Sequence, residues 1–194
     1  ESADFSRATD PVTTFFSPLT FAGSANQTVT VPEAGAALGD LEFNKATNGN
    51  TVTLVGGNLT SGFITFVNGV FKTGDHIVYI PAGLQGAAPA TLQGFSRAGV
   101  TGTNISHVDG FVGKQFVNSG VLATSTFPRQ EFPVGSATKY RPAAVSFNNQ
   151  FGTPGTPSAT IVVKHEDMSP TGFTALPIAN GVEEGVAVGR YAPF

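Results

Sequence analysis

Three histidines, His76, His107 and His165, are the first residues to consider as ligands for a metal ion. His107 and Asp109 are two positions apart, so their side chains point to the same face if the segment is a strand. A metal site needs three or four converging ligands, and this pair supplies only two. The spacing therefore favours a solvated pair near the end of a strand, and we expect no metal ion and no other cofactor.

Motifs of well-known catalytic sites are missing from the sequence. It contains no G-x-S-x-G nucleophile elbow, no H-E-x-x-H zinc motif and no phosphate-binding loop. His165, Glu166 and Asp167 are adjacent, so on a strand they alternate between faces, which indicates an exposed strand end. The chain is therefore predicted not to be an enzyme. The weakest alternative is a β-helical polysaccharide-cleaving enzyme, in which carboxylates converge on a glycosidic bond, for example Asp40, Glu42 and Asp75.

Three Asn-x-Ser/Thr sequons could accept glycans in a suitable host: Asn26-Gln27-Thr28, Asn58-Leu59-Thr60 and Asn104-Ile105-Ser106. In a chain rich in Thr and Asn, three such matches are close to what chance gives, so the sequons assign no site.

The composition limits the classes of partner. Charged residues make up 12% of the 194 residues, against about 25% in ordinary soluble domains, so the surface is either rich in Thr, Ser, Asn and Gly or covered in an assembly. The net charge of −3 offers no basic surface for nucleic acid. No apolar stretch approaches the roughly 20 residues of a transmembrane helix. The chain has no cysteine, which excludes disulfides, and its Thr-, Gly- and Asn-rich composition favours an extracellular location.

Residues 27–80 carry short runs with an apolar side chain at every second position, which is the strand period. The steps between successive runs, from Leu41 to Val52, to Ile64 and to Ile77, are 11, 12 and 13 residues. Turn-forming pairs separate the runs, among them Asn48-Gly49 and Asn68-Gly69. The pattern predicts an all-β fold of antiparallel or solenoid-like β-sandwich modules, with short strands, Gly/Asn turns and no long helices.

Three regions are expected along the chain. Residues 1–21 form an N-terminal extension that includes a possible donated strand, residues 22–95 the regular β-ladder, and residues 96–194 a second sandwich-like region. The weakly patterned connection over residues 81–102 suggests the boundary. Further strands are predicted over residues 106–112, 114–122, 141–147, 159–165 and 186–191, and a loop over the Pro/Gly-rich residues 150–158.

Two motifs in the second half carry a resemblance to a known group of proteins. Phe132-Pro133-Val134-Gly135 and Tyr140-Arg141-Pro142 follow the segment Ser106–Val112, SHVDGFV. Together with the ladder phrases, this FPVG…YRP pattern resembles cell-surface β-repeat, adhesin-like proteins of Bacteroidota-type bacteria, over residues 27–165. The resemblance implies a secreted, surface-attached, all-β module of adhesive or structural character. From the residues themselves, the motif is expected to be a packing corner of a β-domain, because its prolines end strands and Gly135 permits a tight turn.

These observations predict an extracellular structural subunit of a cell-surface filament, sheath or adhesive layer. Its expected partners are copies of itself and, in second place, surface polysaccharide; nucleic acid is not expected. Assembly would use strand edges and apolar patches. The apolar run of residues 12–16, bracketed by Pro11 and Pro18, is predicted to be a strand, either the ordinary first strand of the domain or a strand donated to a neighbouring subunit. The candidate donor residues are Val12, Phe15, Phe16, Leu19 and Phe21. The alternative is a monomeric carbohydrate-binding adhesin module.

Overall fold

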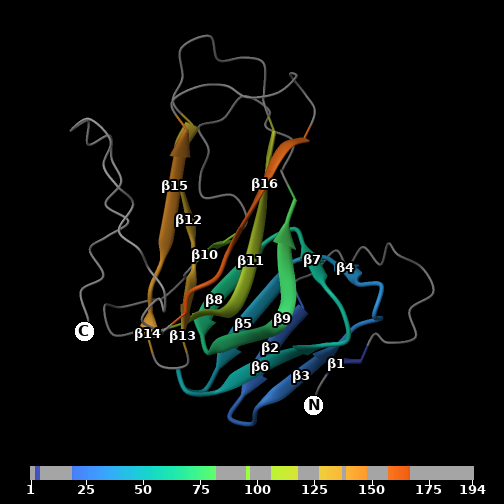
Figure 1. Cartoon of the computed structure of the whole chain (residues 1–194). Helices are drawn as coiled ribbons and strands as arrows, with labels where there is room; N and C mark the ends of the chain where they lie inside the picture. The colour runs from blue at the N-terminus through green and yellow to red at the C-terminus, as the bar shows by residue number, and fades with distance from the viewer. Residues whose placement is uncertain are drawn as a thin grey trace, which may run out of the picture.

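The computed structural model describes residues 3–4, 19–81, 95–96, 106–117, 127–136, 139–147 and 157–166. These residues form sixteen strands and no helix (Figure 1). The all-β class predicted from the alternation is therefore confirmed for the part of the chain that is described. Within the same residues, no helix is long and apolar enough to cross a membrane.

From Leu19 to Ile80 the chain winds through three successive rungs. The first rung consists of β2 (Leu19–Gly23), β3 (Gln27–Thr30) and β4 (Ala36–Leu38). The second consists of β5 (Leu41–Lys45), β6 (Thr51–Val55) and β7 (Leu59–Ser61). The third consists of β8 (Ile64–Asn68) and the long strand β9 (Val70–Ile80), which covers two sides of the rung.

Each strand pairs in parallel with the strand on the same side of the next rung. On one side Leu19 is in register with Leu41, and Leu41 with Ile64. On the other two sides β3 pairs with β6, and β4 with β7, while β9 pairs first with β6 and then with β7. The antiparallel pairing that formed part of the sequence expectation is not found within residues 19–80. The Gly-containing turns therefore connect neighbouring sides of a rung and do not close hairpins.

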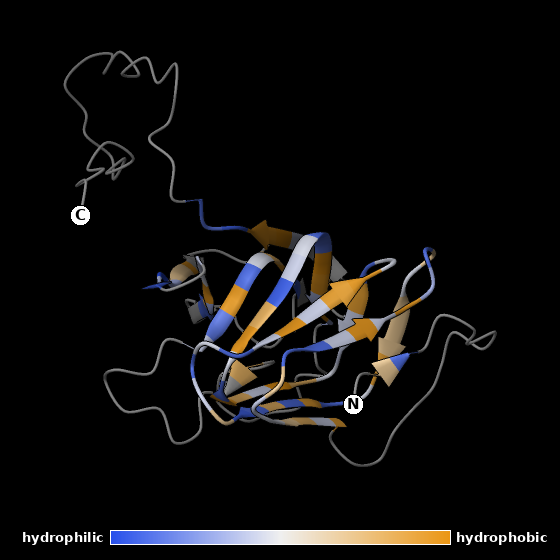
Figure 2. Ribbon diagram, turned by 90° about the horizontal axis from the view of Figure 1, so that it is seen from below, coloured by the Kyte–Doolittle hydropathy of each residue, from blue (hydrophilic) through white to orange (hydrophobic). Residues whose placement is uncertain are grey.

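The apolar side chains of successive rungs stack on one another inside the coil. Figure 2 shows how apolar and polar residues alternate along the strands. The rings of Phe21, Phe43 and Phe66 stack at centroid distances of 5.5 and 5.3 Å, and Phe71 stacks on Phe43 at 4.8 Å. Burying each such ring contributes about 1.5–3 kcal/mol. The inward column of apolar residues thus holds the rungs together in addition to the backbone pairing of their strands.

Asn58 ties three rungs together at one corner. Its backbone carbonyl accepts a hydrogen bond from the Ala36 N–H of the first rung (3.0 Å), and its Oδ1 accepts one from the Ile77 N–H of the third (2.9 Å). The preceding residues Gly56 and Gly57 pass so close to the first rung that side chains would not fit. A Cβ on Gly56 would lie 1.9 Å from the Val31 carbonyl oxygen. The corner is therefore held by backbone packing as well as by the asparagine.

Further strands continue the coil or cover its end. β10 (Phe95–Ser96) pairs with β8, and β11 (His107–Val117) pairs in parallel with β9. β11 is covered by β13 (Val134–Ser136), which leads to β14 (Lys139–Tyr140), and by the antiparallel β16 (Pro157–Val163). β12 (Phe127–Phe132) and β15 (Ala143–Phe147) form a separate antiparallel pair, and β1 (Ala3–Asp4) pairs with β3. In Figure 1, β12, β15 and β16 extend beyond the coil.

The sheet runs without interruption across the region boundary expected at residues 95/96. β9 and β11, one on each side of it, are in register over most of their lengths. β2 likewise spans the expected boundary at residues 21/22.

Several predicted strand ends in the second half were wrong. The break expected at Gly113 is absent, because Gly113 pairs with both Tyr79 and Val162 inside β11. Pro157 and Ser158 belong to β16, although the sequence predicted a loop over residues 150–158. The segments 12–16 and 186–191, each predicted to be a strand, lie outside the described residues.

Candidate functional site

The most unusual chemistry in the described residues is a buried cluster around Lys114. We define the Lys114 cluster as Phe95, His107, Lys114, Glu131, Phe132 and Tyr140. Lys114 lies on β11 with 3% of its surface exposed. Its Nζ lies 5.0 Å from the ring centroid of Phe95 and 5.6 Å from that of Phe132, and it has no hydrogen-bond acceptor in the structure. An ammonium group is usually surrounded by water or paired with an anion. Here two aromatic faces stabilise it instead.

Burial lowers the pKa of Lys114 from its ordinary value of 10.5 to about 8. The cause is the loss of hydration of the charged form in an apolar surrounding. The Glu131 carboxylate acts in the opposite direction, raising this pKa, but it does not outweigh the burial. Near neutral pH, Lys114 is therefore a costly buried cation with a nearby negative charge.

Glu131 is hydrogen-bonded to Tyr140, whose ring is a neighbour of the His107 ring. The Tyr140 hydroxyl donates a hydrogen bond to Glu131 Oε1, and the Tyr140 ring lies 6.4 Å from the His107 ring. His107 is fully buried, so its predicted role in a solvated pair with Asp109 was wrong. The reason is Gly135: a Cβ there would lie 2.7 Å from His107 Cδ2, which shows how closely the β13 backbone covers the imidazole.

The FPVG…YRP residues form the packing corner that the sequence predicted. All four residues from Phe132 to Gly135 are buried. The Val108 N–H donates to the Pro133 carbonyl (2.8 Å), and the Arg141 N–H donates to the Val134 carbonyl (2.9 Å). The motif therefore joins β11, β13 and the chain that follows β14, and supplies one aromatic neighbour of Lys114, Phe132.

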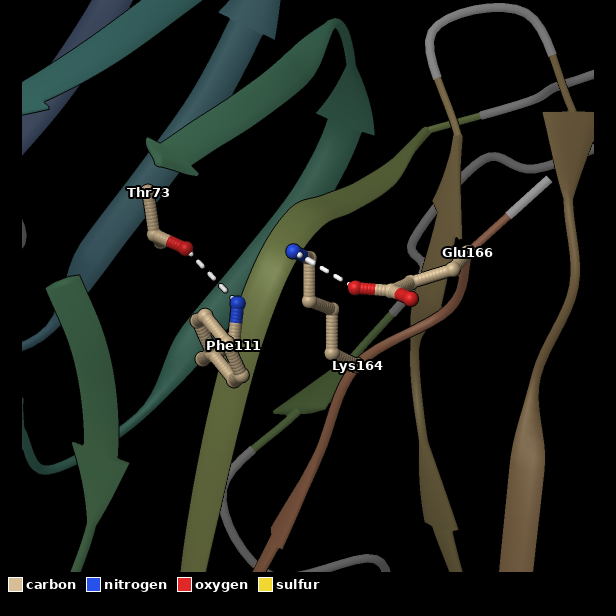
Figure 3. Close-up of polar contacts among 4 residues, drawn as sticks. All are labelled: Thr73, Phe111, Lys164 and Glu166. Atoms are coloured by element: carbon tan, nitrogen blue, oxygen red, sulfur yellow. Dashed lines mark hydrogen bonds and ion pairs between the residues drawn. The ribbon is translucent and has the colours of Figure 1, made fainter. Parts of the chain in front are cut away.

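A second polar group lies on the surface at β11 and β16 (Figure 3). Lys164 Nζ lies 3.0 Å from Glu166 Oε1 and 4.7 Å from the Phe111 ring centroid. The Phe111 N–H donates to Thr73 Oγ1 (2.8 Å), which fixes β11 where it bends at Gly110. Glu166 is exposed beyond the end of β16, as expected for the His165-Glu166-Asp167 segment. An ion pair this accessible contributes at most about 1 kcal/mol.

Two of the five candidate donor residues are already used within their own chain. Phe21 is buried in the aromatic stack. Leu19 packs against the same core, and its N–H donates to the Asp40 carbonyl (2.8 Å). The other three, Val12, Phe15 and Phe16, lie outside the described residues.

The carboxylates considered for glycosidic cleavage are spread over different strands. Glu42 lies on β5, Asp75 at the bend of β9, and Asp40 in the turn before β5. Asp40 and Asp75 are exposed. Nowhere in the described ranges do three or more His, Asp or Glu side chains gather as metal ligands would.

A second buried lysine was also missed by sequence reasoning. Lys45 Nζ donates to the Ala22 carbonyl (2.8 Å) and to Gln27 Oε1 (2.6 Å), and burial lowers its pKa. A signal for both lysines exists in the sequence, because each stands two positions after an inward apolar residue, Phe43 or Val112. Both ammonium groups are buried inside the fold, so their first effect is on the stability of the protein and not on the binding of a ligand.

Comparison with known proteins gave no match to any family model, curated protein or solved structure.

Proposed function

We propose that this chain is an extracellular structural subunit of a cell-surface filament, sheath or adhesive layer, and that its coil is a short β-solenoid. The observation that carries the proposal is the outer edge of β2. In the described residues, β2 pairs only with β5, and it is the last strand on its side of the coil. Unpaired edges of this kind are templates for a strand from another chain.

The direction of the backbone groups supports the same edge. The Leu19 N–H points to β5, since it donates to the Asp40 carbonyl. Neighbouring residues of a paired strand direct their backbone groups to opposite edges, so Thr20 directs its N–H and C=O away from β5. Thr20 is also exposed, which leaves this edge open to a partner strand.

Apolar patches support assembly less strongly than the edge does. The large apolar side chains that are clearly exposed in the described residues are Val55 (45%) and Val162 (42%). Two isolated valines are ordinary for a protein surface. A stable assembly normally buries well over about 1,000 Å², so strand pairing and the low surface charge carry most of the proposal. The donor-strand version now rests on Val12, Phe15 and Phe16.

Replacing Thr20 with proline tests the edge. Proline removes the outward N–H and is tolerated in edge strands, whereas the control Thr20→Ala keeps that N–H. Size-exclusion light scattering and negative-stain electron microscopy should show assemblies for the wild type and for Thr20→Ala, and 19.9 kDa monomers for Thr20→Pro. A wild-type protein that is a clean monomer at all concentrations would overturn the structural role.

One observation favours the alternative, a carbohydrate-binding adhesin module. The Tyr79 ring lies over the backbone of Gly113 on the outward face of β11: a Cβ on Gly113 would be 2.5 Å from Tyr79 Cδ1. Tyr79 is half-buried, so part of its ring is accessible. The accessible part of an aromatic ring held beside a sheet can contact the apolar face of a sugar ring.

For this alternative, the expected result is binding of the monomer to a surface polysaccharide on a glycan array. Tyr79→Ala should abolish the signal, because it removes the stacking face, while Thr60→Ala on the neighbouring strand should retain it. An array without any binding by the wild type would count against the adhesin module.

A further inference from the structure

The turn between β5 and β6 contains an Asn-Gly pair, Asn48-Gly49, whose glycine is exposed. Gly49 is exposed, and the nearest atom to a Cβ built on it would be Thr47 Oγ1, at 3.8 Å. The Asn48 Oδ1 is buried and has no hydrogen-bond donor among the described residues. The amide group of Asn48 is thus not anchored through its oxygen, and the peptide beside it is not packed. We propose that Asn48 is a site of spontaneous deamidation in the folded protein.

The reaction needs only water and the chain itself. The Gly49 backbone nitrogen attacks Asn48 Cγ, forms a new C–N bond, loses its proton and expels the side-chain amide nitrogen as ammonia. The product is a five-membered succinimide. Water then opens either of its two carbonyls, giving aspartate at position 48 or an isoaspartate whose side-chain carbonyl is linked to Gly49. A following glycine favours this chemistry because no side chain hinders the approach of its nitrogen.

Of the other two Asn-Gly pairs, Asn180-Gly181 lies outside the described residues, and Asn68-Gly69 is the natural comparison within the same protein. Gly69 is buried with a φ of +106°, and a Cβ there would lie 2.4 Å from Lys45 Cγ. The next residue is also fixed, because the Val70 N–H donates to the Asn50 carbonyl (3.0 Å). The peptide at Gly69 is therefore clamped between two rungs, which opposes the rotation that ring closure requires.

Deamidation at position 48 would damage the corner that Asn50 organises. The Asn50 N–H donates to the Thr47 carbonyl (3.2 Å), and Asn50 Oδ1 accepts from the Thr47 hydroxyl (2.9 Å). Asn50 Nδ2 donates to the Ser24 carbonyl of the rung below (2.6 Å). The Asn50 backbone carbonyl accepts a hydrogen bond from the Val70 N–H of the rung above. Isoaspartate adds one methylene to the backbone between Thr47 and Asn50, so this closure opens. Aspartate instead places a charge at a buried, unpartnered oxygen, which is unfavourable.

The test is peptide mapping of the intact protein after ageing at mildly alkaline pH. The pairs at Asn48 and Asn68 fall in one tryptic peptide, residues 46–72, since no lysine or arginine occurs between Lys45 and Lys72, and this peptide excludes the third pair at Asn180. Fragment spectra should place the mass gain of amide-to-acid conversion at Asn48 well before Asn68. Ageing in urea, which unfolds the protein, should make Asn48 and Asn68 react at similar rates, because both asparagines precede a glycine. A gain at Asn68 that is equal or faster in the folded protein, or none at Asn48 while the unfolded chain reacts, overturns the proposal.

Gly49→Ala is a matched variant, because a Cβ fits at this position and the backbone is not in the left-handed region. It should keep the initial melting temperature and lose most of the mass gain at Asn48. Aged wild type should melt below fresh wild type, whereas aged Gly49→Ala should not. Equal gains at Asn48 in the variant and the wild type would overturn the proposed route through Gly49.

Discussion

Lys114 and Lys45 both place an ammonium group inside the protein, but the two groups are satisfied differently. Lys45 donates to two oxygens, Ala22 O and Gln27 Oε1, which link the first two rungs. Among the described residues, Lys114 has the faces of Phe95 and Phe132 and the charge of Glu131, and no hydrogen-bond acceptor. A buried charge without hydrogen-bond acceptors costs free energy even when aromatic rings surround it. Lys114 is therefore a local weakness of the fold at neutral pH.

The lowered pKa of Lys114 makes stability depend on pH in a definite direction. Its pKa is about 8 in the folded state and near 10.5 in the unfolded state, so between these values the unfolded chain binds more protons. The free energy of unfolding should rise as the pH increases through this window. Lys114→Met should remove this part of the rise and add roughly 3 kcal/mol of stability at pH 7. Urea unfolding at several pH values measures both effects.

The surface residue Lys164 provides the control for this experiment, because no comparable burial surrounds it. Lys164→Met should leave the pH dependence as in the wild type. If Lys114→Met keeps the wild-type slope between pH 8 and 10.5, the ammonium group is not desolvated as described.

At the scale of elements, the bend shared by β9 and β11 determines how the coil continues into its covered end. The register between the two strands shifts between Asp109 and Phe111, and Gly110 has a φ of +137° at that point. Thr73 is fully buried there and accepts the Phe111 N–H. A Cβ on Gly110 would lie 2.0 Å from Thr73 Oγ1, so the glycine and the threonine depend on each other.

Thr73→Val should destabilise the protein by about 1–3 kcal/mol. Valine has nearly the same shape as threonine, but it leaves the Phe111 N–H without its acceptor. Urea unfolding gives the loss, and faster hydrogen exchange at the Phe111 amide locates it. The control is Thr60→Val, at a half-exposed position of β7, which should have little effect. An unchanged exchange rate at Phe111 would show that Thr73 does not hold the bend.

At the scale of the whole molecule, the strand positions were accessible from the sequence but the pairing was not. An alternation with period two places side chains on two faces in the same way for parallel and antiparallel neighbours, so it locates β5, β6 and β8 without choosing between them. The signal that distinguishes parallel from antiparallel pairing is a repeat with a longer period. Leu19, Leu41 and Ile64 occupy equivalent places at steps of 22 and 23 residues, which is the length of one rung. Only short steps of 11–13 residues were recognised in the sequence.

The buried cluster was less accessible, because its parts come from distant segments. Phe95, Lys114 and Glu131 meet only when β10, β11 and β12 are assembled, and no local spacing connects them. The packing of the FPVG…YRP segment could be predicted in part from its prolines, which end strands. Gly135, which was expected to permit a tight turn, instead lies in β13 without a positive φ. That His107 would be its buried neighbour depends on the pairing of β11 with β13, which no local pattern shows.

The rung is also a unit that a gene duplication can add. Each side of one rung contacts mainly the same side of the next, with like residues stacked on like, as in the column of Phe21, Phe43 and Phe66. Duplicating one stretch of 22 or 23 residues would reproduce contacts that already exist and create no new kind of packing. Such a gene duplication lengthens the molecule by one strand spacing, about 4.8 Å, while its two ends keep their surfaces. Length can therefore vary in this architecture without redesign of the core.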